Sequence, residues 1–445
     1  MRKVAKIYFR RRAMEIARNY YLDKLIRKRG NGLIKVITGV RRCGKSYLLN
    51  TLFFKYLLGN GIAEDHIIRF AFDSADDLQL IGEDFLQLQE QKRKVDPEKF
   101  MDFIRARAIG PDTYYLLLDE VQLLGSFEAV LNGYLRKSNM DVFVTGSNAK
   151  FLSKDIITEF EGRGDEIHMY PLSFAEFMSV FKGDKHEGLA QYMLYGGIPL
   201  VTLQEDPRDK ETLLTGLFSE IYIRDIVSRN RVRNRGELEE LLNFLSSAVG
   251  SLTNPEKLKN AFHSIKKSNI TAATIHKYLG YFEDSFLLEV ATRFDIKGKA
   301  YIETPKKYYF SDMGLRNARI HFRQFEPNHL MENVIYNELR MRGCNVDIGV
   351  VPVAEKDKDG RVVRKQLEVD FICNLGSRRC YIQSAYSIPD PEKKWQEIRP
   401  FRKIDDSFKK ILITQDMIPT HYDDFGILTL NIYDFLLDPA VLERV

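Results

Sequence analysis

Residues 39–46 constrain this chain more than any other segment, because they match the pattern G-x-x-x-x-G-K-[ST] of a phosphate-binding loop. Residues 33–38 before the loop form an apolar run typical of a buried strand, and residues 47–54 after it are typical of an apolar helix. A strand, a glycine-bounded loop and a helix in this order direct backbone N–H groups and the positive helix end toward one point. The pattern therefore predicts a site for the phosphates of ATP or GTP. The residues expected to form it are Gly39, Val40, Arg41, Arg42, Cys43, Gly44, Lys45 and Ser46.

Four side chains of this loop have chemistry suited to a nucleotide. The pattern predicts that Lys45 reaches the β- and γ-phosphates and that the Ser46 hydroxyl is a ligand of Mg²⁺. Arg41 and Arg42 either touch phosphate or face a neighbouring subunit.

A second apolar run, residues 113–118, ends at Asp119 and Glu120. A continuous apolar run of this length is typical of a strand buried on both faces of a parallel sheet. Downstream of a phosphate-binding loop, the two carboxylates favour a Walker B element. Asp119 would then hold Mg²⁺, and Glu120 would orient and deprotonate the attacking water. The alternative is an acidic strand end without a catalytic role.

Three further polar residues are catalytic candidates. Ser147 and Asn148 follow the apolar run at residues 141–145, and either would contact the γ-phosphate or the attacking water. A turn after the strand explains the same two residues without a catalytic role. Arg163 would supply positive charge to the transition state, or it is an ordinary surface arginine.

Strands alternate with helices in the first 170 residues, and a further strand is predicted at residues 66–73. This alternation indicates a doubly wound α/β domain whose ligands lie at the carboxyl ends of parallel strands. A helix is expected over residues 10–30, where apolar residues recur at helical spacing. We therefore assign residues 1–170 to a P-loop domain with a parallel sheet.

Residues 171–325 are predicted to be a mainly helical linker region that ends in a winged helix-turn-helix. Two short helices at residues 258–279 precede two strand-like runs within residues 289–310. The basic run Arg229–Arg235 would follow a nucleic-acid backbone, or it is a solvated loop. A helix-turn-helix also serves in some proteins only as a contact for another protein.

Residues 326–445 are predicted to be a second α/β domain, with a helix over residues 330–340 followed by alternating strands and loops. Glu332, Asp370, Gln383 and Ala385 occur in the order of a metal-dependent nuclease of the PD-(D/E)xK kind. Such a nuclease needs a carboxylate at position 383 and a lysine at position 385, which hold Mg²⁺ and position the water. Because both groups are replaced, we expect an inactive nuclease-like module.

The composition bears on the partners and the cellular compartment expected of this chain. The formal net charge of 445 residues is only +5, so any nucleic-acid surface must be local. Four cysteines without a C-x-x-C pair suit a reducing cytoplasm. No run of 18 apolar residues occurs, so no membrane span is expected, and the basic start lacks the apolar core of a signal peptide.

Taken together, these motifs resemble a prokaryotic family of AAA+-type P-loop ATPases with a C-terminal domain of unknown function. The resemblance covers nearly the whole chain, and it implies ATP rather than GTP, together with Mg²⁺. It also implies a winged helix and a degenerate nuclease-like fold, but not the biological process. We expect a cytoplasmic Mg-dependent ATPase or ATP-driven switch, with a homo-oligomer or a protein as the possible partner. The alternative is a DNA-binding or DNA-processing factor that ATP regulates. The further segments that carry the resemblance are residues 145–149, 162–163, 171–174, 196–199 and 308–316.

Overall fold

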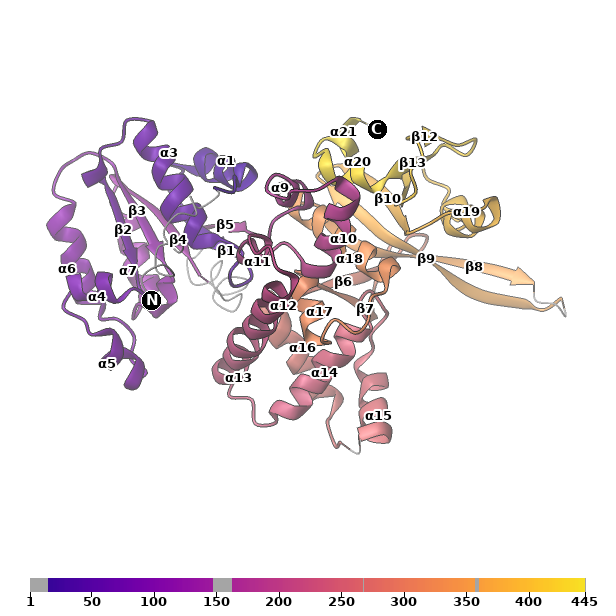
Figure 1. Ribbon diagram of the computed structural model, residues 1–445, viewed down its shortest axis with the longest axis horizontal. Helices are drawn as coiled ribbons and strands as arrows, with labels where there is room; N and C mark the ends of the chain where they lie inside the picture. The colour runs from indigo at the N-terminus through magenta and orange to yellow at the C-terminus, as the bar shows by residue number, and fades with distance from the viewer. Residues whose placement is uncertain (1–14, 147–161, 267, 357–359, 445) are drawn as a thin grey trace, which may run out of the picture. The chain divides into compact units, whose positions relative to one another are not determined.

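The computed structural model describes residues 15–146, 162–266, 268–356 and 360–444. It divides the chain into two compact units, coloured in sequence order in Figure 1. The first unit comprises Met1–Met169 with Met178–Lys182, and the second comprises Tyr170–Phe177 with Gly183–Val445. In the described part of the chain, no helix is both long enough and apolar enough to cross a bilayer.

The first unit contains a five-stranded sheet in the order β2-β3-β4-β1-β5, and all its neighbouring strands are parallel. The strands β1, β3 and β4 are buried at every residue, as expected of a parallel sheet covered on both faces. This sheet confirms the predicted α/β fold. The strands are β1 (Ile34–Thr38), β2 (Ile67–Ala71), β3 (Tyr114–Asp119), β4 (Met140–Thr145) and β5 (Gly164–His168).

Helices surround this sheet (Figure 1). One continuous helix follows β1, and it consists of α2 (Lys45–Tyr47), a π-helical segment (Leu48–Phe53) and α3 (Phe54–Gly59). The helix expected over residues 10–30 is shorter in the described chain, because α1 begins at Asn19. Arg18 precedes it with a non-helical backbone, and its carbonyl accepts the N–H groups of Tyr21 and Leu22. The other helices are α1 (Asn19–Lys28), α4 (Ala75–Leu80), α5 (Phe85–Glu90), α6 (Pro97–Arg107) and α7 (Phe127–Leu135).

The second unit begins with helices. Two of them, α15 and α16, are the pair expected in the winged helix-turn-helix, and the Thr271 side chain caps α16 by accepting the Thr274 N–H. The helices up to this point are α9 (Phe174–Met178), α10 (Lys185–Tyr195), α11 (Pro199–Thr202), α12 (Pro207–Gly216), α13 (Arg224–Asn230), α14 (Arg235–Ser247), α15 (Pro255–Lys266) and α16 (Ala272–Asp284); a π-helical segment (Leu217–Ile223) joins α12 to α13.

An eight-stranded mixed sheet follows, in the order β12-β13-β11-β10-β9-β8-β6-β7. The antiparallel pair β6–β7 is the hairpin expected as the wing, but β6 also pairs in parallel with β8. The hairpin therefore belongs to the same sheet as the last third of the chain. The strands are β6 (Leu288–Asp295), β7 (Ala300–Phe310), β8 (Asn345–Lys356), β9 (Val362–Leu375), β10 (Arg378–Ala385), β11 (Lys409–Thr414), β12 (His421–Tyr422) and β13 (Ile427–Asn431).

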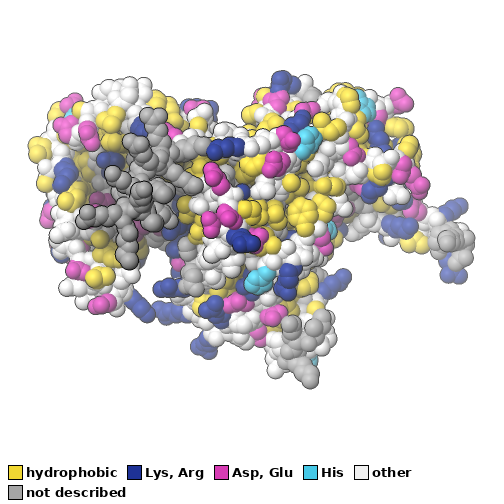
Figure 2. All heavy atoms as spheres, in the orientation of Figure 1, with side chains coloured by type: hydrophobic (Ala, Val, Ile, Leu, Met, Phe, Trp, Pro, Cys, Tyr) yellow, Lys and Arg dark blue, Asp and Glu magenta, His cyan; other side chains and the backbone are white. Residues whose placement is uncertain are grey.

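Strands β8 and β9 continue as a two-stranded ribbon beyond the helices that cover the sheet, which are α17 (Met313–Arg319), α18 (Pro327–Met341), α19 (Pro391–Ile398), α20 (Ile432–Leu437) and α21 (Val441–Arg444) (Figure 1). Residues 360–366 are all exposed, although side chains alternate between the two faces of a strand. Neither face of this part of the ribbon therefore packs on a core. Figure 2 shows Lys and Arg side chains gathered toward the free end of the ribbon.

Asp312 holds together two of the segments that carried the resemblance. Its carboxylate accepts the N–H of Gly197 at 2.7 Å and the N–H of Leu315, in the first turn of α17, at 3.1 Å. A Cβ on Gly196 would lie 2.1 Å from an Asp312 oxygen, so residue 196 must be glycine. Burial raises the pKa of Asp312 to about 6, although the backbone N–H groups around it oppose this rise.

Candidate nucleotide-binding site

The phosphate-binding loop leaves β1 in a conformation that only glycine allows at its first position. Gly39 has φ of 135°, and a Cβ there would lie 2.0 Å from the carbonyl oxygen of Met169. Gly44 also has positive φ, at 105°, and it directly precedes the helix that begins at Lys45. The two glycines thus shape the loop as a turn that ends at a helix N-terminus, as the sequence predicted.

Lys45 is 5% exposed, and its ammonium group points back into the loop. It donates to the carbonyls of Gly39 at 2.9 Å and Val40 at 3.1 Å. These bonds hold the ammonium within the curve of the loop, where phosphate oxygens are equally able to accept them.

Arg18, which precedes α1, contacts the loop through a hydrogen bond. Its guanidinium is almost fully buried, at 2% exposure, and Nη1 donates to the carbonyl of Cys43 at 2.9 Å. The guanidinium also lies 4.8 Å from the centre of the Tyr21 ring on α1. The sequence did not single out Arg18, since a lone arginine beside a helix carries no pattern. Of the two arginines within the loop, Arg42 is exposed and has positive φ, while Arg41 is half-buried.

Asp119 and Ser46 lie together at the carboxyl end of the sheet. The Asp119 carboxylate is 5% exposed and accepts hydrogen bonds from the hydroxyls of Ser46 and Thr145. Asn50 Nδ2 approaches its other oxygen at 3.4 Å. Burial raises the pKa of Asp119, while the bonds from Thr145 and Ser46 and the charge of Lys45 act to lower it. The structure thus brings together the two residues predicted to hold Mg²⁺.

Thr145 joins the two predicted Walker B residues. Its hydroxyl donates to the Asp119 carboxylate and accepts the backbone N–H of Glu120 at 3.0 Å. Glu120 has a left-handed backbone, with φ of 52°, and its carboxylate accepts a hydrogen bond from Gln122. The sequence placed Thr145 inside a strand and gave it no role, although its position at the last residue of β4, beside β3, was the available signal.

Asp73 adds a third carboxylate near this pair. Asp73 follows β2. Burial is the largest cause that raises its pKa, and the negative charges of Asp119 and Glu120 raise it further. Arg42 acts to lower that pKa, so the exposed loop arginine also faces this cluster. Among the described residues, no three His, Cys, Asp or Glu side chains are grouped so as to hold a metal ion by themselves. A cation at this place therefore needs the Ser46 hydroxyl and phosphate oxygens as further ligands, which is the arrangement that Mg²⁺ prefers.

Arg163 lies at the opposite end of the strands. Its carbonyl accepts the N–H of Ile34 at 2.9 Å, and Ile34 opens β1, whereas the loop follows the end of β1. Four residues of strand separate the two ends by about 13 Å. The structure therefore does not bring Arg163 to the loop of its own chain, and its role at the transition state stays a prediction. Ser147 and Asn148 lie outside the described residues.

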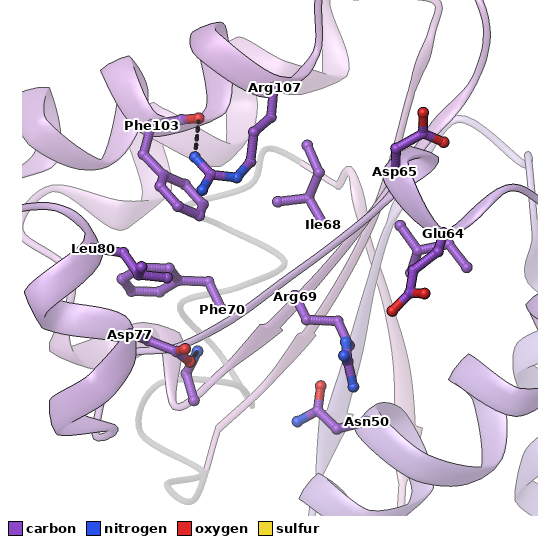
Figure 3. Close-up of a pocket in the computed structure, with 12 residues that line it drawn as sticks. Asn50, Glu64, Asp65, Ile68, Arg69, Phe70, Asp77, Leu80, Phe103 and Arg107 are labelled. Carbon is purple, nitrogen blue, oxygen red and sulfur yellow. Dashed lines mark hydrogen bonds between the residues drawn. The ribbon is translucent and has the colours of Figure 1, made fainter.

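A separate pocket follows the outer edge of β2 (Figure 3). Arg69 and Asn50 lie on one side of it, and Phe70 and Phe103 lie on the other. None of its lining residues belongs to the loop or to the Asp119–Glu120 pair. Asn50, through its contact with Asp119, connects this pocket to the candidate site.

Sequence comparisons agree with this geometry. The family described as AAA domain matches residues 31–178, and a domain of unknown function (DUF8612) matches residues 186–326. An uncharacterized protein of Haemophilus influenzae is 35% identical over 95% of this chain and 98% of its own length. The chain therefore belongs to the family of that protein. The AAA domain match agrees with the P-loop fold of the first unit.

Two more distant similarities extend the comparison. The uncharacterized protein MJ1544 of Methanocaldococcus jannaschii is 27% identical over 91% of this chain and 86% of its own length. The Walker-type ATPase PABY2304 of Pyrococcus abyssi, a solved structure, is 15% identical and covers 70% of this chain and 97% of its own, with a TM-score of 0.47.

Proposed function

We propose that this protein binds ATP together with Mg²⁺ and hydrolyses it, and that the bound nucleotide acts as a switch on the rest of the chain. The observation that carries the proposal is the Thr145 contact, which ties Asp119 and Glu120 together where Ser46 meets Asp119. A loop that holds phosphates and an adjacent carboxylate pair are the parts that ATP hydrolysis requires.

Each residue has one role in this proposal. Lys45 exchanges the carbonyls of Gly39 and Val40 for phosphate oxygens, and Ser46 and Asp119 hold Mg²⁺. The metal supplies positive charge against the phosphates. Glu120 orients the attacking water and takes its proton, and Thr145 keeps the two carboxylates in place. Ser147 or Asn148 contacts the γ-phosphate or this water.

ATP binding tests the first part of the proposal. In Lys45→Ala, the loss of a charged donor to phosphate costs about 1.5–3 kcal/mol, so ATP affinity should fall about 10- to 100-fold. Titration calorimetry with a slowly hydrolysed ATP analogue and Mg²⁺ measures this change. Lys137→Ala, which removes an exposed lysine after α7, is the matched control and should bind as the wild type does. Unchanged affinity in Lys45→Ala would refute the assignment of the loop.

A second candidate function is ATP-regulated binding of DNA. It is supported by Arg231 and Arg233, which are exposed, whereas Arg229 pairs with Asp225 and Arg235 pairs with Glu239. The β8–β9 ribbon adds exposed cations outside this run. These cations are Lys356, Arg361, Arg364 and Lys365.

Salt dependence distinguishes this candidate from a protein switch. Cations that contact phosphates release counterions, so the affinity for duplex DNA should fall steeply as salt rises. The double change Arg231→Ala and Arg233→Ala should weaken binding. It should also make the fall of log affinity with log salt concentration less steep, by the contribution of about two phosphate contacts. Fluorescence anisotropy measures both effects between about 50 and 200 mM salt, a range over which phosphate contacts change the affinity for DNA strongly. No binding at the lowest salt would exclude DNA and leave a protein as the partner.

The last part of the chain is proposed to be a nuclease-like module that no longer cleaves. Supporting this proposal, Glu332, Asp370, Gln383 and Ala385 line one pocket. Lys307, from β7, donates to Glu332 at 3.0 Å and approaches Glu368 at 2.7 Å. Burial acts to lower the pKa of Lys307, but the facing carboxylates outweigh it and raise the pKa, so the ammonium stays charged. An internal cation thus already balances the carboxylates that would otherwise bind a metal.

The proposed division into three domains follows the same reasoning. Residues 1–170 form the ATPase domain, 171–325 the helical region with the winged helix, and 326–445 the nuclease-like domain. The pairing of β6 with β8 connects the proposed wing with the last domain in one sheet.

A further inference from the structure

Three of the four cysteines lie together in the second unit, although Cys344 is well separated in the sequence from Cys373 and Cys380. Cys344 directly precedes β8, Cys373 lies on β9 and Cys380 lies on β10. The thiol of Cys373 makes sulfur hydrogen bonds with both of the others. None of the three has a role in the proposed ATPase site, where the fourth cysteine, Cys43, is found.

The strand register makes one pair geometrically ready for a covalent bond. Cys373 and Cys380 are direct partners in the antiparallel ladder between β9 and β10. Residues directly opposite in such a ladder point to the same face, and their Cα atoms are about 4.5–5.5 Å apart. A disulfide spans Cα atoms that are about 4.4–6.8 Å apart. The bond between these two sulfurs therefore requires no rearrangement of the sheet.

A surface pocket gives small reagents access to the thiols. Cys373 is 3% exposed and Cys344 is 2% exposed, but Cys380 is partly exposed, and all three line the same pocket. Three cations also line it, and they are Arg378, Arg379 and Lys409. The thiolate is the form of cysteine that reacts with oxidants.

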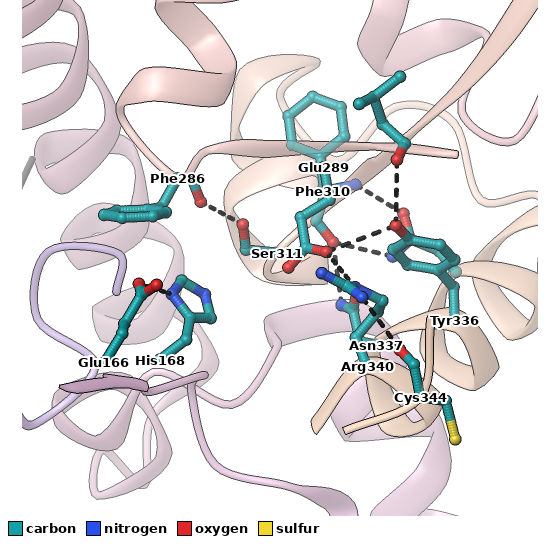
Figure 4. Close-up of polar contacts among 12 residues, drawn as sticks. Glu166, His168, Phe286, Glu289, Phe310, Ser311, Tyr336, Asn337, Arg340 and Cys344 are labelled. Atoms are coloured by element: carbon teal, nitrogen blue, oxygen red, sulfur yellow. Dashed lines mark hydrogen bonds and ion pairs between the residues drawn. The ribbon is translucent and has the colours of Figure 1, made fainter. Parts of the chain in front are cut away.

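The surroundings of Cys344 differ from those of its two neighbours. A hydrogen bond from Cys373, followed by the charges of Arg342 and Arg340, lowers the pKa of Cys344, while burial opposes this effect. Arg340 Nη1 donates to the carbonyl of Cys344 at 3.0 Å and thus fixes the residue before β8 (Figure 4). The hydrogen bonds with Cys344 and Cys380, followed by burial, raise the pKa of Cys373, which is therefore the proton donor within the group.

We propose that Cys373 and Cys380 are a modification site, at which a hydroperoxide converts the two thiols into a reversible disulfide. The partly exposed Cys380 thiolate attacks the peroxide oxygen and becomes a sulfenic acid, and the other peroxide oxygen leaves as water or an alcohol. The Cys373 sulfur then attacks the Cys380 sulfur, and the hydroxyl group leaves as water with the Cys373 proton. The two electrons that the thiols lose reduce the peroxide, and a dithiol restores both thiols.

The cluster is not proposed as a metal site. Three thiolates suit a soft metal ion, but among the described residues no group of His, Cys, Asp or Glu side chains has an arrangement that would hold one. A disulfide would act on the sheet instead. It would connect β9 and β10 three residues along each strand from Asp370 and Gln383, which line the acidic pocket.

Peptide mapping of the full-length protein tests the proposal. The protein is treated with hydrogen peroxide, its remaining thiols are blocked with an alkylating reagent, and it is digested with trypsin without reduction. Cleavage after Lys and Arg places Cys344, Cys373 and Cys380 on three different peptides, because Lys356, Lys365, Arg378 and Arg379 separate them. We expect a linked pair of the Cys373 and Cys380 peptides, a fall from four free thiols to two, and full recovery with dithiothreitol.

Two variants sharpen the result. Cys344→Ser should form the same linked pair, whereas Cys380→Ser should form none. Linkage of Cys344 to Cys373, oxidation of single cysteines beyond the sulfenic acid without any linkage, or retention of all four thiols would each overturn the proposal. Because the main result is obtained with the wild-type protein, it does not depend on the folding of either variant.

Discussion

A single hydroxyl group contacts both of the adjacent acidic residues of the candidate site. Thr145 donates to the Asp119 carboxylate and accepts the backbone N–H of Glu120, so one side chain connects the end of β4 with the end of β3. The loop residues, by contrast, were all evident from the sequence, because the motif fixes both their identity and their spacing. Thr145 has no such pattern. Its role arises only because β4 lies beside β3 in the sheet, and the order of strands is not contained in any local segment.

Thr145→Val should therefore impair turnover more than binding. The change keeps the shape of the side chain but removes hydrogen bonds to a charged carboxylate and to a backbone N–H, which are worth about 1.5–3 kcal/mol. We expect kcat for ATP to fall about 10- to 100-fold while ATP affinity changes little. Steady-state kinetics and calorimetry measure the two quantities. Thr145→Ser keeps the hydroxyl, and it should restore most of the activity; equal loss in both variants would assign the effect to packing instead.

At the scale of elements, periodicity and apolar runs predicted most strands and helices of both units close to where the structure has them. The runs at residues 66–73, 113–118 and 141–145 correspond to β2, β3 and β4. The predicted helix begins too early in the sequence, because the apolar spacing continues through residues that come before Asn19, where α1 begins. Pairing between elements was harder to predict. The sequence could not show that Lys307 on β7 contacts Glu332 on α18, because this contact depends on how the helix packs on the sheet.

Lys307→Met should destabilise the second unit and make its stability depend more strongly on pH. Removal of one partner of a buried ion pair costs about 3–5 kcal/mol. Urea unfolding at pH 7 should show this loss, whereas Lys306→Met, on the other face of the same strand, should cost much less.

The pH dependence of Lys307→Met has a definite sign. Burial and the charge of Glu332 already raise the pKa of Asp370, and the loss of the ammonium removes a group that lowers it. A carboxyl whose pKa is raised in the folded state stabilises the fold at low pH, and this contribution is lost as pH rises through the folded-state pKa. The deficit of the variant should therefore be smaller at pH 5 than at pH 8. A deficit that is equal at both pH values would contradict the view that Lys307 balances these carboxylates.

At the scale of the whole molecule, the chain consists of a P-loop unit and a larger unit with its own mixed sheet. The first was fully apparent as a class from its motifs, because phosphate binding requires specific residues at fixed spacing. The second has no motif of that kind. Its acidic pocket, thiol group and exposed ribbon each involve the pairing of β9 with its neighbours β8 and β10 in the sheet. A nucleotide site in one unit can control the other only if nucleotide binding favours one of two arrangements, which requires different contacts to ATP and to its hydrolysis products.

ATP hydrolysis by the purified full-length protein, beside Glu120→Gln, tests whether Glu120 activates the attacking water. The amide keeps the size of the side chain but cannot accept the proton of the attacking water, so turnover with Mg²⁺ should fall by a factor of about 10²–10⁴. Glu90→Gln, an exposed change at the end of α5, should retain the wild-type rate. The same assay with duplex DNA shows whether DNA stimulates turnover. A Glu120→Gln protein that hydrolyses ATP as fast as the wild type would contradict the account of the site.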